Sequence, residues 1–251
     1  SLASADLRLE KTLRLGERWF SYSDNSGPAG FPRYYLQPAP PESATGVPPS
    51  PRVVTVTLPS DVVFRFSAQM VPDNQVGAPI DAGRIVFDPM PGTVGSLEPL
   101  DDALALNDEV LVVGQGAGEV DLYDYETSDV YDPSIFRLTT ADGNQFLIDE
   151  TVGVLRQSDP NGNWTEYHDD RIVHSNGMQL TLVRDDDDLE DDPTLTTEVV
   201  IELMRPGTTE AIYRSDAIIL SEQGRALLAG AVFADVRGPL FFGLRSTRKA
   251  G

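Results

Sequence analysis

The stretch FRLTTADGNQFLIDETVGVLRQSDPNGNWTEYHDDRIVHSNG, residues Phe136–Gly177, decides the fold of this chain. Short runs of alternating apolar and polar residues are separated by three turn dipeptides, Asp142-Gly143, Asn161-Gly162 and Asn176-Gly177. Alternation with a period of two is typical of a β-strand that buries one face. Because an Asn-Gly or Asp-Gly pair supplies the two positive-φ residues of a type I′ turn, each dipeptide indicates a tight hairpin. The stretch predicts consecutive antiparallel hairpins that form a meandering, repeat-built sheet.

The remainder of the chain favours the same fold class. Residues Leu7–Tyr22 alternate well enough to form one or two strands. The runs Val53–Leu58 and Val62–Ala68 predict a further hairpin, in which one face carries Val54, Val56, Leu58, Val62, Phe64 and Phe66. We therefore expect an all-β protein built of meandering antiparallel hairpins, with long irregular loops and little helix.

Composition changes along the chain suggest its organisation. At 251 residues the chain has room for one large β domain or two small ones. A Pro-rich segment, Pro38–Pro51, predicts an extended connector because proline lacks the amide donor that a sheet requires. We expect N-terminal strands and this connector in residues 1–52. The antiparallel β domain then occupies residues 53–251 and carries the hairpins at 136–177.

The charge of the chain excludes some partners. Forty acidic against nineteen basic side chains give a formal net charge of −21. Binding to nucleic acid requires the opposite sign to displace counterions from phosphate, so no nucleic-acid partner is expected. The charge indicates a solvated surface kept soluble by self-repulsion, or attraction to a basic partner. The chain has no cysteine, which excludes disulfides, thiolate metal sites and cysteine nucleophiles.

No targeting or membrane segment is recognisable. No apolar run reaches the length of about eighteen residues that a spanning helix needs, so membrane insertion is not expected. The N-terminal residues SLASADLRLEK lack the apolar core of a signal peptide. If the protein is exported, we expect that a signal was removed or lay elsewhere in a longer parent chain.

Two motifs resemble binding sites only superficially. Gly114-Gln115-Gly116-Ala117-Gly118 follows an apolar run, but a dinucleotide-binding loop needs the spacing G-x-G-x-x-G at the start of a helix. The residues that follow alternate as a strand, so a strand-to-strand loop is expected. His168 and His174, the only histidines, have no helix-borne metal-ligand spacing, and we interpret them as surface polar residues.

Carboxylates are abundant without forming a recognisable site. The run Asp185–Pro193 holds seven acids in nine residues, which predicts an exposed loop, and it does not match the ligand spacing of an EF-hand. Irregular calcium binding at residues 185–192 stays open. There is no G-x-S-x-G nucleophile motif. Asn163-Trp164-Thr165 is formally a glycosylation sequon in an expected turn. We expect no catalytic residues, no cofactor and no metal ligands.

The central stretch resembles the YD-repeat of rearrangement-hotspot (Rhs) and teneurin-type proteins over about forty residues. The resemblance departs from the repeat at one position, where His168 separates Tyr167 from Asp169. The matching residues are Asp142-Gly143, Phe146, Asp149, Gly153, Leu155, Asp159-Pro160-Asn161-Gly162-Asn163, Tyr167, Asp169, Arg171 and Ile172.

The resemblance implies a structural role. YD-repeat shells are spiral sheets that enclose a space and, in bacterial members, hold a toxic C-terminal domain. The resemblance therefore implies a non-enzymatic structural or interaction module of a secreted or cell-surface bacterial protein. This module would form part of a shell or its cap. The partner would be a larger YD-repeat protein or the remainder of a parent chain. Self-cleavage at an Asp-Pro-x-Gly motif, known in some relatives, is not assigned to Asp159–Gly162, because here the motif is an ordinary turn.

Two other functions remain open from sequence. The first is a β-sandwich module that binds glycan or protein at a cell surface, with Trp19, Trp164 and Tyr167 as the first contacts. The second is a hydrolase that uses two carboxylates, whose separation in space cannot be derived from sequence spacing.

Overall fold

The computed structural model describes residues 7–38, 51–59, 61–101, 104–114, 118–168, 171–184, 198–204 and 211–219. In these ranges the regular structure is antiparallel β-sheet, with one 3-10 turn at Pro28–Gly30 and no α-helix. The expectation of an all-β protein with meandering antiparallel hairpins is confirmed. Most of the Pro-rich connector, the acidic run Asp185–Pro193 and residues Asp169 and Asp170 lie outside the described residues.

Contacts divide the chain into two units, residues 7–164 and residues 165–251 with 1–6. The described part of the first unit contains a nine-stranded antiparallel sheet. In spatial order its strands are β1 (Arg8–Lys11), β4 (Val53–Thr57), β5 (Val63–Val71), β7 (Ala82–Pro89), β9 (Glu109–Val113), β10 (Gly118–Asp124), β2 (Trp19–Asp24), β3 (Arg33–Gln37) and β6 (Asn74–Val76).

The division of the chain differs from the one expected at residue 52. Strand β1 pairs with β4, and β2 pairs with β10, so the N-terminal strands belong to the same sheet as strands that follow the Pro-rich segment. An isolated pair of N-terminal strands would leave its edge N–H and C=O groups without sheet partners. Pairing with β4 and β10 supplies those partners, so described strands that precede and follow the Pro-rich segment belong to one unit.

The predicted hairpin after this segment is present as β4 and β5. Val54 lies opposite Phe66 and Val56 opposite Phe64, and all four side chains are buried. Val62 differs from the expectation, because it precedes β5 and is 48% exposed. The inward face of β5 is continued by Ala68 and Met70, as the period of two requires.

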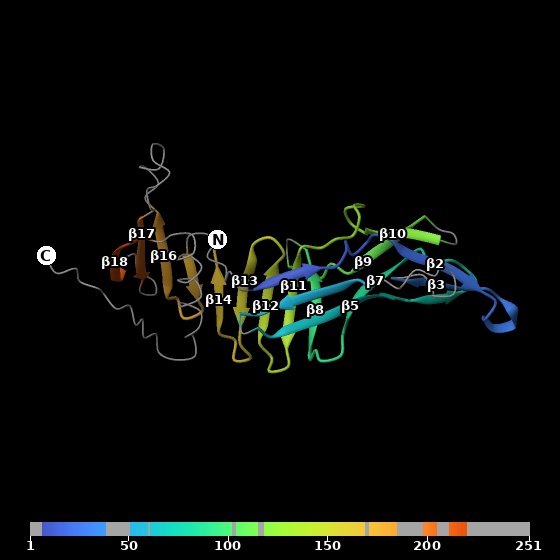
Figure 1. Ribbon diagram of the computed structural model, residues 1–251, viewed down its shortest axis with the longest axis horizontal. Helices are drawn as coiled ribbons and strands as arrows, with labels where there is room; N and C mark the ends of the chain where they lie inside the picture. Colours follow the sequence, from blue (N-terminus) through green and yellow to red (C-terminus); the bar gives the residue numbers. More distant parts are fainter. Residues whose placement is uncertain are drawn as a thin grey trace. The chain divides into compact units, whose positions relative to one another are not determined.

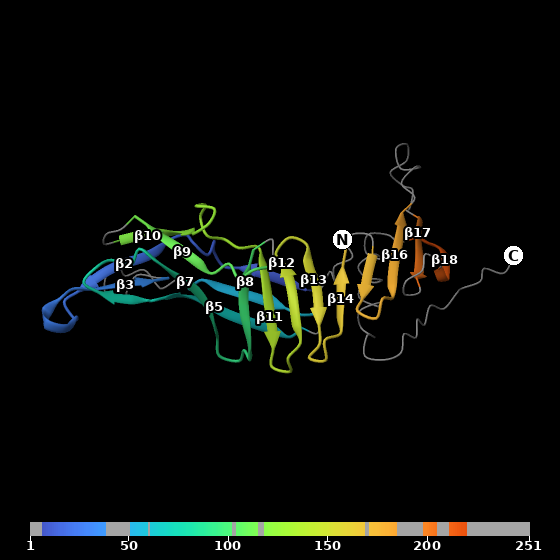
Figure 2. The same ribbon diagram turned by 180° about the vertical axis from the view of Figure 1, so that it is seen from behind.

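A second sheet of the first unit is formed by β8 (Gly95–Leu100), β11 (Ile135–Thr140), β12 (Gln145–Asp149) and β13 (Gly153–Ser158), in that order. Figures 1 and 2 show β11, β12 and β13 side by side, with the strands β5 and β7 running across their direction. One face of this sheet buries Phe136, Leu138 and Ile148 completely. Phe136 contacts Phe87 of β7, so the two sheets of the unit share one apolar core.

The predicted turns are present, but their geometry differs from type I′. In the first, Gly143 N–H donates to Thr140 O and Thr140 N–H donates to Asn144 O, which closes a three-residue loop. Of the dipeptide only Gly143 has positive φ, at 82°. This is the pattern of a type I turn followed by a left-handed glycine. Because Asp142 keeps negative φ, the dipeptide does not supply two left-handed residues.

The other two dipeptides form the same turn. Gly162 N–H donates to Asp159 O and Gly177 N–H donates to His174 O. Gly162 and Gly177 have φ of 86° and 83°, whereas neither Asn161 nor Asn176 is left-handed. In the second turn Pro160 occupies the position of a type I turn that a fixed φ near −65° favours.

In the second unit the described strands follow one another in sequence order. They are β14 (Trp164–Tyr167, whose first residue belongs to the first unit), β15 (Arg171–His174), β16 (Gln179–Arg184), β17 (Glu198–Met204) and β18 (Ala211–Ile219). Each of the four pairings is antiparallel. Tyr167, Ile172 and Leu180 are buried.

Candidate functional site

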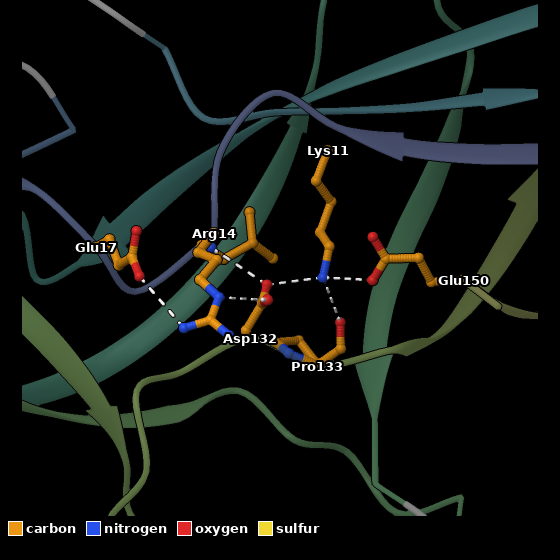
Figure 3. A network of polar contacts seen from close by, with 7 residues as sticks. Lys11, Arg14, Glu17, Asp132, Pro133 and Glu150 are labelled. Carbon is orange, nitrogen blue, oxygen red and sulfur yellow. Dashed lines mark hydrogen bonds and ion pairs between the residues drawn. The ribbon is translucent and has the colours of Figure 1, made fainter.

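A cluster of charged side chains surrounds Lys11, at the end of β1. Figure 3 shows its ammonium group between two carboxylates that are distant in sequence. The Nζ atom lies 2.7 Å from Asp132 Oδ1 and 2.6 Å from Glu150 Oε2. It also donates to Pro133 O at 3.3 Å. The cluster joins β1 to the segment before β11 and to the turn between β12 and β13.

Burial is uneven within this cluster. The Lys11 side chain is 7% exposed, whereas those of Asp132 and Glu150 are 23% and 37% exposed. The amine is therefore the member that has lost most of its water. Removing an ammonium group from water costs several kcal/mol unless charged and hydrogen-bonding partners replace the solvent. The two carboxylates and the Pro133 carbonyl supply that replacement.

Local backbone contacts hold the cluster in place. Glu150 N–H donates to Ser134 O at 2.9 Å, which ties the turn that carries Glu150 to the segment that carries Asp132. The Leu15 N–H donates to Asp132 Oδ1 at 3.4 Å. Arg14 Nε lies 3.7 Å from Asp132 Oδ2, and its guanidinium also pairs with Glu17 (Figure 3). Asp132 thus receives donors from several directions.

Arg52 is a second buried cation of the same unit. Its side chain is 1% exposed and donates to the carbonyl oxygens of Glu17 and Pro38. Burial lowers the pKa of the Arg52 guanidinium, with the nearby Arg18 acting in the same direction. Because Arg52 donates to backbone carbonyls of two separate loops, it holds these loops together and has the features of a structural residue.

The two histidines do not share a site. His168 Nε2 lies 3.8 Å from Glu166 Oε2, whereas His174 Nδ1 accepts a hydrogen bond from Asn176 N–H at 3.2 Å. Thr165 pairs with His174 across β14 and β15, while Glu166 pairs with Val173. Since side chains alternate along a strand, His174 and Glu166 lie on opposite faces of this hairpin. Within the described ranges no group of three metal-ligating side chains is present.

The glycine-rich segment connects two strands, β9 and β10. Its central residues 115–117 lie outside the described ones. A hollow of about 330 Å³ beside it is lined by Val113, Gly114, Glu119, Val120, Asp121 and Tyr123. No helix begins at Gly118, so the backbone amides that hold a pyrophosphate are not arranged there. The carboxylates of Glu119 and Asp121, which line the hollow, would also repel a phosphate group.

The aromatic residues expected as glycan contacts have different surroundings. Trp19 is fully buried and donates its indole N–H to Leu15 O at 2.7 Å. Tyr167 is 8% exposed, and burial raises the pKa of its phenol. These two side chains are core residues and do not offer a ring face to a ligand. Trp164 is half-buried, and the Arg156 guanidinium lies 4.7 Å from its ring centroid.

A more accessible aromatic group was not expected from sequence. Tyr22 and Tyr35 stack at 4.8 Å between ring centroids on β2 and β3. The Tyr35 hydroxyl lies 2.9 Å from Ser26 Oγ, which also hydrogen-bonds to Asp24. The sequence alone does not indicate this pair, because Tyr22 lies opposite Tyr35 only in the observed register of β2 and β3.

In the part of the chain that the structure describes, no helix is long and apolar enough to span a bilayer. Comparison with family models, with curated proteins and with solved structures gives no match to this chain.

Proposed function

We propose that the chain is a non-enzymatic structural and interaction module of a secreted or delivered bacterial protein of the Rhs-like, YD-repeat type. In this proposal it forms part or cap of a shell, and its partner is a larger YD-repeat chain or the remainder of a parent chain. The supporting observation is the succession of short antiparallel strands joined by tight turns between residues 135 and 184.

The residues that carry the resemblance have structural roles in these hairpins. Gly143, Gly153 and Gly162 all have positive φ at turns. The Asp149 carboxylate accepts the N–H groups of Thr151 and Val152. A pattern of glycines and aspartates is therefore explained by repeated chain reversal, without a catalytic role for any of them.

The Asp159 turn shows the same principle. Its carboxylate accepts the N–H groups of Asn161 and Asn163, both at 2.9 Å, and the Asn163 side-chain amide at 2.8 Å. These bonds satisfy the turn internally, which supports an ordinary hairpin at Asp159–Gly162 and not a cleavage site. Because these polar groups of the turn form hydrogen bonds within it, the turn needs no partner from outside. The strands that it joins can then pair with neighbouring strands, as a sheet built of repeats requires.

The experiment is co-expression of this chain with any YD-repeat protein that its neighbouring coding sequence encodes. The proposal expects a complex of defined stoichiometry that survives gel filtration. Because the chain carries a net charge of −21, the complex is tested again at about 1 M salt, where the Debye length falls to about 3 Å. Survival of the complex at this salt concentration would support contact through packed strands. Elution of a free 27.3-kDa chain in low salt would contradict the proposal.

Two matched variants distinguish the contribution of the hairpins to the complex from the contribution of the net charge. Asn161→Asp adds one negative charge without requiring a new backbone conformation, whereas Gly162→Ala leaves the charge unchanged and opposes the left-handed turn residue. The proposal expects Gly162→Ala to weaken the complex more than Asn161→Asp does. The reverse order would assign the association to charge.

A further inference from the structure

The contact between Lys11 and Asp132 places a primary amine against a carboxyl group inside the fold. Nζ and Oδ1 are 2.7 Å apart, and Glu150 Oε2 lies 2.6 Å from the same nitrogen. We propose that this is a self-modification site, at which Lys11 and Asp132 condense to an intramolecular amide with Glu150 as the catalytic residue. The proposal is independent of the function proposed above.

The reaction balances without any further reactant. The ammonium group of Lys11 passes one proton to the Asp132 carboxylate by way of Glu150, and the free amine attacks Cγ of the resulting carboxylic acid. A C–N bond forms, Glu150 takes a second proton from the nitrogen, and it delivers this proton to the hydroxyl that departs as the Cγ–O bond breaks. The products are one neutral amide and one water molecule, and Glu150 ends in its starting state.

The surroundings of Asp132 suit this chemistry. Attack on Cγ develops negative charge on the carboxyl oxygens, and preorganised donors aimed at that charge stabilise the transition state. The Leu15 N–H reaches Oδ1 at 3.4 Å, and Arg14 Nε lies 3.7 Å from Oδ2. Glu150 contacts the nucleophile directly and is the most solvent-exposed of the three, which permits it to pass a proton and release water.

Burial and proximity both favour condensation. The Lys11 ammonium group is the most buried member of the cluster, and its conversion to a neutral amide removes the desolvation cost that the charged form bears. Groups held in reactive geometry attain effective molarities of about 10⁵ M or more, which offsets the unfavourable equilibrium of amide formation in water. The chain has no cysteine and thus no disulfide, and this bond would join β1 to a segment 121 residues away.

The test is the intact mass of the purified, folded chain. The proposal expects a mass lower than that of the sequence by one water molecule, and the full sequence mass for Lys11→Arg, Asp132→Ala and Glu150→Gln. Lys11→Arg is the matched control, because it keeps the positive charge but its guanidinium is not a nucleophile. Asp132→Asn is expected to close as well, with loss of ammonia in place of water. A wild-type chain of full mass would overturn the proposal.

Peptide mapping identifies the position of the lost water. The amide predicts a branched tryptic peptide that joins residues 9–14 to residues 85–137, because trypsin does not cleave after an acylated lysine. A cyclic imide at Asp142-Gly143 would produce the same mass change without a branch. Water loss located there, with separate peptides for Lys11 and Asp132, would overturn the proposal even though the intact mass agreed.

Discussion

The ring of Phe136 on β11 meets the ring of Phe87 on β7 edge to face, with 5.8 Å between centroids and an interplanar angle of 85°. Phe136 is fully buried and Phe87 is 7% exposed. Such a pair contributes about 0.5–1.5 kcal/mol beyond the burial of its apolar area. The contact is the clearest point at which the nine-stranded sheet and the hairpin sheet of residues 7–164 share a core.

Substitution of Phe136 by alanine tests this shared core. The change removes a fully buried ring and leaves a cavity, so we expect the free energy of unfolding to fall by about 3–5 kcal/mol. Urea denaturation measures the loss. Phe31→Ala serves as the control because Phe31 is 59% exposed, and its effect should stay within about 0.5 kcal/mol. Equal effects of the two substitutions would show that the sheets do not pack through Phe136.

The turn geometry predicts an asymmetry within the Asn161-Gly162 dipeptide. Gly162→Ala forces a side chain into the left-handed region and is expected to cost about 1–2 kcal/mol of stability. A Cβ there would meet no atom within 4 Å, so the cost is conformational and not steric. Asn161→Ala should cost less, because Asn161 has negative φ. A type I′ turn would instead penalise both substitutions, and urea denaturation distinguishes the two cases.

Substitution of Gly16 tests close packing at a position where the backbone φ is not in the left-handed region. A Cβ at this position would lie 2.5 Å from Leu122 O and 2.7 Å from Tyr131 O. Since these atoms belong to backbone, Gly16→Ala must displace a strand, and we expect destabilisation of about 1–3 kcal/mol or more. Thermal unfolding measures it. A Tm equal to that of the wild type would contradict the close approach of these segments.

The turn carboxylates predict a loss of stability in acid. Hydrogen bonds from Thr140 lower the pKa of Asp142, and hydrogen bonds from Asn163 lower the pKa of Asp159. A folded pKa below the unfolded value of about 3.9 gives stabilisation that is present above that value and is lost as the pH falls through the folded pKa. We therefore expect the free energy of unfolding to decrease as the pH is lowered below about 4.

The control for this pH dependence is the double variant Asp142→Asn, Asp159→Asn. Its amides retain an acceptor oxygen for the turn but do not titrate. Part of the acid-dependent loss should disappear in denaturation curves recorded across the acid range. An unchanged slope of stability against pH would mean that these two carboxylates do not contribute.

Tryptophan fluorescence tests the placement of the two indoles. Trp164→Phe leaves Trp19, which is fully buried, so the variant should emit at short wavelength and resist quenching by acrylamide. The wild type should be quenched more, because half-buried Trp164 contributes. If Trp19 in the variant were quenched as readily as a free indole, the core position of β2 would be wrong.

Local patterns were sufficient to predict the hairpin of β4 and β5 and the hairpins of the central stretch. The alternation in Val53–Leu58 and Val62–Ala68 correctly placed Val54, Val56, Phe64 and Phe66 in the core, because a period of two fixes which side chains face inward. In the central stretch the alternation correctly indicated antiparallel hairpins. The positions of the three turns were also predictable. Their type was not, because Asn-Gly and Asp-Gly suit both a two-residue type I′ loop and a three-residue loop whose glycine alone is left-handed.

Pairings between distant segments were beyond the sequence. No local signal shows that β1 pairs with β4, or that β2 pairs with β10, since each depends on which strand edges remain open elsewhere. The same holds for the cluster around Lys11, whose partners are 121 and 139 residues away. For Trp19 and Tyr167 the expectation from sequence was wrong: both were expected to contact a ligand, and both are core residues. An aromatic residue in an alternating run is compatible with a ligand surface and with a core, and only the folded chain assigns it.

The most direct test of the hairpin ladder is a set of backbone NOEs from the isotopically labelled chain. The structure predicts cross-strand contacts between Leu138 and Phe146, between Leu147 and Arg156, and between Tyr167 and Ile172. Their presence would establish successive antiparallel hairpins through residues 135–174. Helical amide–amide NOEs along this stretch, or a register that pairs these residues with other partners, would contradict the account.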